Sequence, residues 1–470
     1  MTLTHIAIFG ALTFLAAFLS DRLRGFFLFT LSVLAVYALQ PALPIRYLDF
    51  WLPTAALGLT FIFWISLAPR ESRFTRGNLL SAAWMGLLIL TLALTRFLPS
   101  APSPLTPSVP PRLELVFAAL LVVAALAALT GRVRFGWVHA VGLTALVVLL
   151  AVLKSPEASL WAAKTLRLAN GQSAETASSF DIRWLGFSYI AFRIIHTLRE
   201  RRMGTLPEVS LREYATYIFF YPALTAGPID RLERFVKDLR APFKPADEDW
   251  IVVVQRVGLG LFKKFVLADS LALMALSAQN AAQVRSTGWA WILLYAYAFQ
   301  IFLDFSGYTD IAIGLARMVG IRLPENFNAP YLRANLTQFW NNWHMTLTMW
   351  FRAYFFNPLT RFLRMRRLPV WLVIFVTQFS TMVLIGAWHG LTVNFLVWGL
   401  WQGLGLFVHN RWSDALRARF AEWASTPLRQ NVLNVSGVFL TFHFVALGWV
   451  WFALPTPALA VQFFGRLLGI

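Results

Sequence analysis

Long apolar runs recur from one end of the chain to the other, and they constrain the fold more than any other feature of the sequence. Each run has roughly 16–22 residues, close to the ~20 that a helix needs to cross a hydrocarbon core of ~30 Å. Hydrophobic residues make up 58% of the 470 residues and charged residues 13%, and no run alternates with the period of two that marks a membrane β-barrel. We therefore expect an all-α integral membrane protein with about eleven to thirteen transmembrane or re-entrant helices.

The polar residues divide these runs into two groups. Up to residue 155 they lie only between the runs, so we expect residues 1–155 to be an N-terminal scaffold, whereas after residue 200 they also lie within the runs. The expected spans cover residues 3–20, 25–40, 53–68, 79–98, 113–131, 135–153, 184–198, 251–276, 289–319 (interrupted at 304–310), 335–350, 370–386, 391–409 and 431–453. We expect the first of them to be a retained span, because it lacks the basic start and the small-residue cleavage site of a signal peptide.

The basic residues gather in alternate loops. The chain has 41 Lys and Arg against 22 Asp and Glu, and arginines cluster near residues 22, 73, 133 and 201 but are few in the loops between these positions. Such alternation is the positive-inside pattern of cytoplasmic loops. We expect a multi-pass protein of a bacterial cytoplasmic (inner) membrane with its N-terminus outside the cytoplasm, and an extended extracytoplasmic segment at the proline-rich residues 99–111.

A run of helix breakers interrupts the apolar residues 217–235, which contain Pro222, Gly227 and Pro228. Irregular backbone at membrane depth persists only where protein or a water-filled cavity satisfies its hydrogen bonds. We interpret this segment as re-entrant or interfacial in preference to a plain loop, and we expect Gly227 and Pro228 to line a cavity.

The most polar membrane segment reads FWNNWHMTLTMWFR, at residues 339–352. On one continuous helix, with 100° per residue, four polar side chains fall within roughly 80° of one another. They are Asn341, His344, Thr348 and Arg352, while Trp340, Met349 and Phe351 point elsewhere. Such a stripe should face protein or water, because its exposure to lipid would be costly. A hydrogen-bonded core stripe and an interfacial belt remain alternatives.

A second histidine lies in GAWHG, where Trp388 and His389 stand between Gly386 and Gly390 at the junction of two apolar helices. Glycines there allow another backbone or a substrate to approach closely. A lone histidine at a helix junction usually has a structural role. Two histidines, one on a polar stripe and one between glycines, favour instead a shared functional centre formed by His344 and His389. The other histidines lack polar company, and we interpret them as structural. They are His5, His139, His196, His409 and His443.

Two carboxylates, Asp304 and Asp310, stand about 240° apart on an ideal helix and cannot both face one cavity unless the helix breaks. We expect either that Ser306 and Gly307 break it or that one carboxylate pairs with a loop arginine. The chain has no cysteine, which excludes disulfides, thiolate metal sites and a covalent thioester on this chain.

Five segments together resemble the membrane-bound O-acyltransferases, specifically their bacterial cell-envelope branch of alginate and peptidoglycan O-acetyltransferases and teichoic acid D-alanyl transfer proteins. The segments, within residues 180–410, are FFYPALTAGPIDRLERF, GLFKKFVLAD, DFSGYTDIAIGLARMVGIRLPENFNAPY, FWNNWHMTLTMWFR and GAWHG. The resemblance implies a helical ring around a central tunnel, with His389 as catalytic base and His344 as its partner. Ala353 stands where relatives usually carry aspartate, and Asn341 and Asn342 where they often carry arginine.

From the resemblance we expect a catalytic core at 180–410, closed by C-terminal helices at 411–470. It would move an acyl group, in the first place acetyl, from a cytoplasmic thioester to a hydroxyl acceptor for an extracytoplasmic envelope polysaccharide. The donor would be acyl-CoA or an acyl carrier protein, and the partners an extracytoplasmic acyltransferase or acceptor protein and membrane lipid, with no nucleic acid, metal or permanent cofactor. The expected substrate-binding or tunnel residues are Asn341, Asn342, Thr348, Arg352, Trp388, Asp304, Gly227 and Pro228.

Three other functions remain open at this point. The first is D-alanyl transfer to teichoic-acid-like polymers from a carrier-protein thioester. The second is a transporter or flippase that uses the polar stripe as its path, and the third is a scaffold that recruits envelope enzymes.

Overall fold

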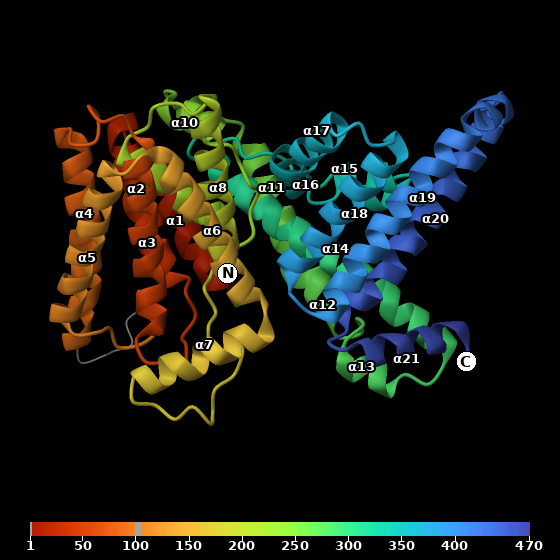
Figure 1. The fold of residues 1–470 in the computed structure, drawn as a ribbon, viewed down its shortest axis with the longest axis horizontal. Helices are drawn as coiled ribbons and strands as arrows, with labels where there is room; N and C mark the ends of the chain where they lie inside the picture. The colour runs from red at the N-terminus through yellow and green to blue at the C-terminus, as the bar shows by residue number, and fades with distance from the viewer. Residues whose placement is uncertain (1, 99–104) are drawn as a thin grey trace. The chain divides into compact units, whose positions relative to one another are not determined.

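The fold is that of a computed structural model, which describes residues 2–98 and 105–470. All regular elements in these two ranges are helices, which confirms the all-α prediction (Figure 1). Seven helices in these ranges are long and apolar enough to cross a membrane, so the chain is a multi-pass membrane protein. Others fall short for identifiable reasons, since α1 (Leu3–Ala17) is short and α2 (Asp21–Ala38) begins with three charged residues in its first four.

The chain packs as two compact units. Unit 1 comprises Met1–Val257 and Ile311–Pro324, and unit 2 comprises Gly258–Asp310 and Glu325–Ile470. These units are a division by packing and not by role, so the expected division into scaffold, catalytic core and closing helices stays a prediction.

Unit 1 contains most of the helices expected in the first half of the chain. After α1 and α2 come α3 (Leu48–Leu67), α4 (Arg76–Leu94), α5 (Leu113–Arg132), α6 (Phe135–Lys154), α7 (Pro156–Ala169), α8 (Phe187–Met203), α9 (Leu211–Phe219), α10 (Leu232–Arg240) and most of α11 (Trp250–Leu261). Helices α3, α4 and α5 pack side by side (Figure 1). Of the proline-rich segment expected to be extended, residues 99–104 lie outside the described ranges, and residues 105–111 contain no helix.

Helix α7 was not expected, because its sequence is polar. It lies crosswise to α3 (Figure 1) and buries Ala163 against Leu48 and Leu52. A buried ion pair of 2.6 Å between Arg167 and Asp181 ties the following loop to the helix. Tertiary packing, which a local polar pattern does not report, therefore stabilises this helix.

The predicted break after residue 217 is confirmed. Helix α9 ends at Phe219, a short 3₁₀ turn covers Tyr221–Ala223, and the chain stays irregular until α10 begins at Leu232. The buried guanidinium of Arg193 donates to the carbonyl oxygens of Tyr217 (3.1 Å), Ile218 (2.7 Å) and Ala223 (3.2 Å). Protein therefore satisfies the carbonyls that the break leaves without helical partners.

Gly227 and Pro228, in the same segment, are both buried in unit 1. A Cβ atom at residue 227 would lie 2.3 Å from the Cα atom of Ala223, so only glycine fits there. The segment is thus tightly packed at this point, and its expected role in lining a cavity stays a prediction.

Unit 2 contains most of α14 (Thr287–Arg317) and the C-terminal helices. The others are α12 (Asp269–Ala272), α13 (Ala278–Gln283), α15 (Leu336–Asn342), α16 (Met345–Phe351), α17 (Asn357–Met365), α18 (Val370–His389), α19 (Val393–Trp423), α20 (Pro427–Ala453) and α21 (Pro457–Leu468). Two stretches, Phe262–Ala268 and Arg352–Phe356, form π-helix. Helices α18 and α19 form an antiparallel hairpin, and α20 packs beside α19 (Figure 1).

Helix α14 runs unbroken through residues 304–310, so the predicted interruption is wrong. Both carboxylates pair with lysines of the first π-helical stretch: Asp304 with Lys264, and Asp310 with Lys263 at 2.7 Å. A Cβ atom on Gly307 would lie 2.8 Å from the carbonyl oxygen of Gly260. The glycine therefore permits close packing of two helices and does not end one.

Candidate active site

The polar segment 339–352 is not one helix, so the expected span over 335–350 is wrong. Helix α15 ends at Asn342 and α16 begins at Met345, and His344 between them has φ 42° and ψ 53°, in the left-handed region. A non-glycine residue rarely adopts this conformation unless its surroundings hold it there. The four polar residues therefore do not share one helical face, because the helix is interrupted at His344.

Asn326 supports the break from a distant part of the chain. Its side chain is fully buried, and its backbone oxygen accepts from the amide of Met345 at 2.9 Å. Its Oδ1 lies 3.0 Å from Nδ1 of His344 and accepts from the amide and the hydroxyl of Thr346 at 3.2 and 2.9 Å. The sequence showed Asn326 only as one letter of PENFNAPY, and nothing in its residue type singled it out.

The two histidines of interest belong to one aromatic cluster in unit 2. The ring of His344 lies 4.6 Å from that of Phe305 and 6.4 Å from that of Trp388, and the ring of Trp388 lies 4.5 Å from that of His389. The ring of Phe452 packs against the ring of His389, with 4.7 Å between the two ring centroids. Trp388 thus contacts both histidines, as a shared centre requires.

His389 is the last residue of α18, and the glycines beside it allow close contacts with α19. A Cβ atom on Gly386 would lie 2.3 Å from the carbonyl oxygen of Phe395, and one on Gly390 would lie 2.7 Å from the Phe395 ring. The expected close approach of another backbone is therefore confirmed at Gly386. His389 is half-buried, whereas His344 is only 4% exposed.

Burial lowers the pKa of the His344 imidazole. His344 is therefore neutral near pH 7, with one protonated ring nitrogen and one lone pair. Its Nε2 atom is buried and has no hydrogen-bond partner among the described residues. No group of three or more His, Asp or Glu side chains in the described ranges is placed to hold a metal ion.

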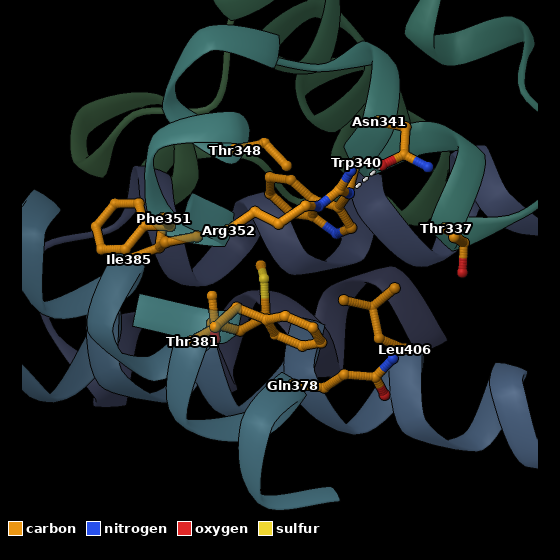
Figure 2. Close-up of a pocket in the computed structure, with 12 residues that line it drawn as sticks. Thr337, Trp340, Asn341, Thr348, Phe351, Arg352, Gln378, Thr381, Ile385 and Leu406 are labelled. Atoms are coloured by element: carbon orange, nitrogen blue, oxygen red, sulfur yellow. Dashed lines mark hydrogen bonds between the residues drawn. The ribbon is translucent and has the colours of Figure 1, made fainter. Parts of the chain in front are cut away.

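A cavity of about 330 Å³ lies beside this cluster, between α15 and α16 on one side and α18 and α19 on the other (Figure 2). Its lining consists of Thr337, Trp340, Asn341, Thr348, Phe351, Arg352, Phe356, Gln378, Thr381, Met382, Ile385 and Leu406. Arg352 donates to Oδ1 of Asn341 at 2.5 Å. It is the one charged side chain among the described residues of this lining, and the rest is mainly apolar.

Three of the predicted tunnel residues, Asn341, Thr348 and Arg352, do line this cavity. Trp340 and Phe351, which we expected to point elsewhere, line it too, and that expectation assumed one continuous helix, which the turn at His344 interrupts. The indole N–H of Trp340 and Oε1 of Gln378 are buried and lack hydrogen-bond partners within residues 2–98 and 105–470. They are available to a polar ligand in this cavity.

The other predicted site residues lie elsewhere. Neither His344 nor His389 belongs to the described lining of the cavity, and Asn342 donates to the carbonyl of Gln338 at 2.7 Å. Asp304 is paired with Lys264, as described above. Gln378 and Thr381 are lining residues that the sequence did not reveal, because they come from α18, whose apolar pattern shows only that it spans.

Comparison with known proteins agrees with these features. Residues 140–450, more than half of the chain, match the sequence model of the membrane-bound O-acyltransferase family. The chain is 32% identical over 292 residues to a teichoic acid D-alanyltransferase of Streptococcus thermophilus, covering 58% of this chain and 68% of the relative. It is 33% identical over 274 residues to a probable alginate O-acetylase of Pseudomonas aeruginosa, covering 57% of this chain and 48% of the relative.

A third relative is a peptidoglycan O-acetyltransferase of Helicobacter pylori, 31% identical over 264 residues, covering 55% of this chain and 47% of the relative. The match thus spans about half the length of the alginate and peptidoglycan relatives. The segments that carry the two histidines, the cavity and Asn326 all lie inside the matched region. The chain belongs to the membrane-bound O-acyltransferase family.

Proposed function

We propose that this protein transfers an acyl group, in the first place acetyl, from a cytoplasmic thioester donor to a hydroxyl group for modification of an extracytoplasmic envelope polysaccharide. The observation that carries the proposal is the cluster in which Trp388 contacts both His344 and His389, in a chain of an O-acyltransferase family. The alternating arginine loops support a bacterial cytoplasmic membrane with the N-terminus outside.

His389 acts as general base in the proposed reaction. The hydroxyl oxygen bonds to the thioester carbonyl carbon while His389 takes the hydroxyl proton. The carbon–sulfur bond then breaks, and the proton passes from His389 to the departing thiolate. Histidine suits this role because its ordinary pKa lies near neutral pH. His344, buried and neutral, holds one of the reacting groups.

The cavity beside the cluster binds part of the thioester donor. Its lining is mainly apolar, and Arg352 adds one positive charge. The side-chain partner of Arg352 is the neutral amide of Asn341, so no carboxylate in the described ranges neutralises this charge. A phosphate of acyl-CoA or of a carrier protein's phosphopantetheine arm matches this charge. Trp340 and Gln378 offer a donor and an acceptor to the amides of the same arm.

D-alanyl transfer from a carrier-protein thioester is the second candidate. One observation favours it: the match spans a larger share of the teichoic acid relative (68% of its length) than of the alginate relative (48% of its length). Both candidates use a thioester, so the mechanism and the cavity are common to them. Partners on the extracytoplasmic side would be an acyltransferase or an acceptor protein.

The purified protein in lipid nanodiscs should release free thiol from one of two donors, acetyl-CoA or a D-alanyl carrier protein, in the presence of a hydroxyl-bearing oligosaccharide. A thiol reagent can follow the reaction because the chain contains no cysteine. Release from neither donor, by protein that unfolds cooperatively, would contradict the proposal, and the donor that is used decides between the two candidates.

The role of the cavity has its own test. Arg352→Gln should raise the KM for the donor about tenfold or more, because a hydrogen bond to a charged group contributes ~1.5–3 kcal/mol and ~1.4 kcal/mol is a factor of ten. Arg361→Gln is the matched control, since Arg361 is an exposed arginine of α17 outside the lining. Equal KM values for the two variants would remove the donor from this cavity.

A further inference from the structure

The side chain of Asn326 is buried against the turn at His344 and contacts it through one oxygen atom. It is 0% exposed and lies in an irregular segment before α15. One atom, Oδ1, is within hydrogen-bond distance of three groups: the amide and the hydroxyl of Thr346 and Nδ1 of His344.

The backbone amide of Thr346 fixes which way the Asn326 side chain points. An amide N–H can only donate, so the atom 3.2 Å from it must be the carbonyl oxygen of Asn326 and not its NH₂ group. That oxygen can only accept. Nδ1 of His344, 3.0 Å away, must therefore be the nitrogen that carries the proton.

The opposite ring nitrogen then carries the lone pair. A neutral imidazole has one N–H and one acceptor nitrogen, so Nε2 of His344 is an acceptor. It is buried and has no partner in the part of the chain that the structure describes, among aromatic neighbours that include Phe305 and Trp388. A buried acceptor without a partner destabilises a folded protein, because it has lost its hydrogen bonds to water and gained none in their place. Such an atom is therefore expected where a ligand supplies the missing donor.

We propose that Asn326 is a positioning residue that holds His344 in the Nδ1–H tautomer, so that Nε2 accepts a hydrogen bond from a hydroxyl or amide N–H of a bound substrate. The substrate contact rests on the proposed function, whereas the tautomer does not. His344 thereby orients a reacting group as an acceptor, while His389 removes the proton.

A purely structural role for Asn326 makes a different prediction. The bond from the Met345 amide goes to the backbone oxygen of Asn326, so any residue at this position can keep it. If Asn326 only supports the turn, replacing its side chain should lower stability and leave the tautomer unchanged.

The tautomer can be measured directly by ¹⁵N NMR of the full-length protein labelled at its seven histidines, because protonated and unprotonated ring nitrogens differ widely in chemical shift. His344→Gln identifies the signals of His344. We expect Nδ1 to be protonated and Nε2 unprotonated in the wild-type protein. The opposite pattern would overturn the proposal, whatever the transfer activity, and the expected pattern in a protein without acyl transfer would overturn only the proposed function.

Two variants test the consequence for the reaction. Asn326→Leu removes the acceptor at similar size, and it should lower kcat about 10–100-fold, the effect usual for residues that orient an active-site group, with little change in donor KM. Asn326→Asp keeps an acceptor oxygen in place and should recover kcat to within about tenfold of the wild type. Equal kcat values for the two variants, or an unchanged kcat in Asn326→Leu, would contradict the positioning role. If Asn326→Leu does not fold, two measurements still test the proposal. Protonation of Nε2 in the wild-type protein, or a kcat of Asn326→Asp more than about tenfold below the wild type, would contradict it.

Discussion

Replacing Gly386 by alanine should separate α18 from α19 just before His389, the proposed catalytic base. The added Cβ atom would lie 2.3 Å from the carbonyl oxygen of Phe395 and 3.2 Å from its carbonyl carbon. Both atoms belong to the backbone of α19, so no side-chain rotation can relieve the contact. Overpacking of this kind costs ~1–3 kcal/mol, and the better helix propensity of alanine offsets up to ~1 kcal/mol of it.

The free energy of unfolding in detergent is the quantity to measure, by thermal denaturation at fixed detergent and lipid. Gly258→Ala is the matched control, since Gly258 also lies inside a helix but has nothing within 4 Å of an added Cβ. The control should keep or raise the transition temperature, and Gly386→Ala should lower it by several degrees, at roughly 2–4 °C per kcal/mol. Gly386→Ala should also lower turnover, because His389 lies three residues further on. Equal transition temperatures for the two variants would refute the close packing.

Three further predictions concern unit 1. Arg193→Met should lower the free energy of unfolding by ~3 kcal/mol or more, because it leaves three carbonyl groups of a buried break without their donor; a transition temperature equal to that of Arg202→Met, an exposed arginine of the same helix α8, would contradict this. Pro228→Cys, in a chain with no other cysteine, should react with a water-soluble thiol reagent if its segment borders a cavity, and complete protection in folded protein would place it in packed core. A reporter fused after residue 74 should report the cytoplasm and one after residue 105 the outside, and the reverse at both sites would invert the topology.

The spans themselves could be predicted from the sequence because lipid imposes a length on apolar helices. Helices α5 and α6 begin and end within one or two residues of the expected ranges, and the break after residue 217 follows from Pro222 and Gly227. These features depend on local chemistry, which a sequence displays directly.

Features set by distant residues could not be predicted in the same way. The left-handed turn at His344 depends on Asn326, 18 residues away. Helix α14 continues past Asp304 and Asp310, which pair with Lys264 and Lys263 of a distant segment, respectively. Asn341, Thr348 and Arg352 line one cavity, but across a turn between two short helices and not along one helical face, and His344 is not part of that lining.

In the proposed reaction His389 performs the transfer, with His344 beside the same tryptophan. The most direct test is the turnover of purified His389→Ala with the donor that the wild-type protein uses, compared with His409→Ala, a histidine of α19 bonded to Ser413 and outside the cluster. General-base catalysis contributes ~10²–10⁴-fold, so His389→Ala should lose at least a hundredfold in kcat while His409→Ala stays near the wild type. Near-normal turnover in folded His389→Ala would show that His389 is not the general base.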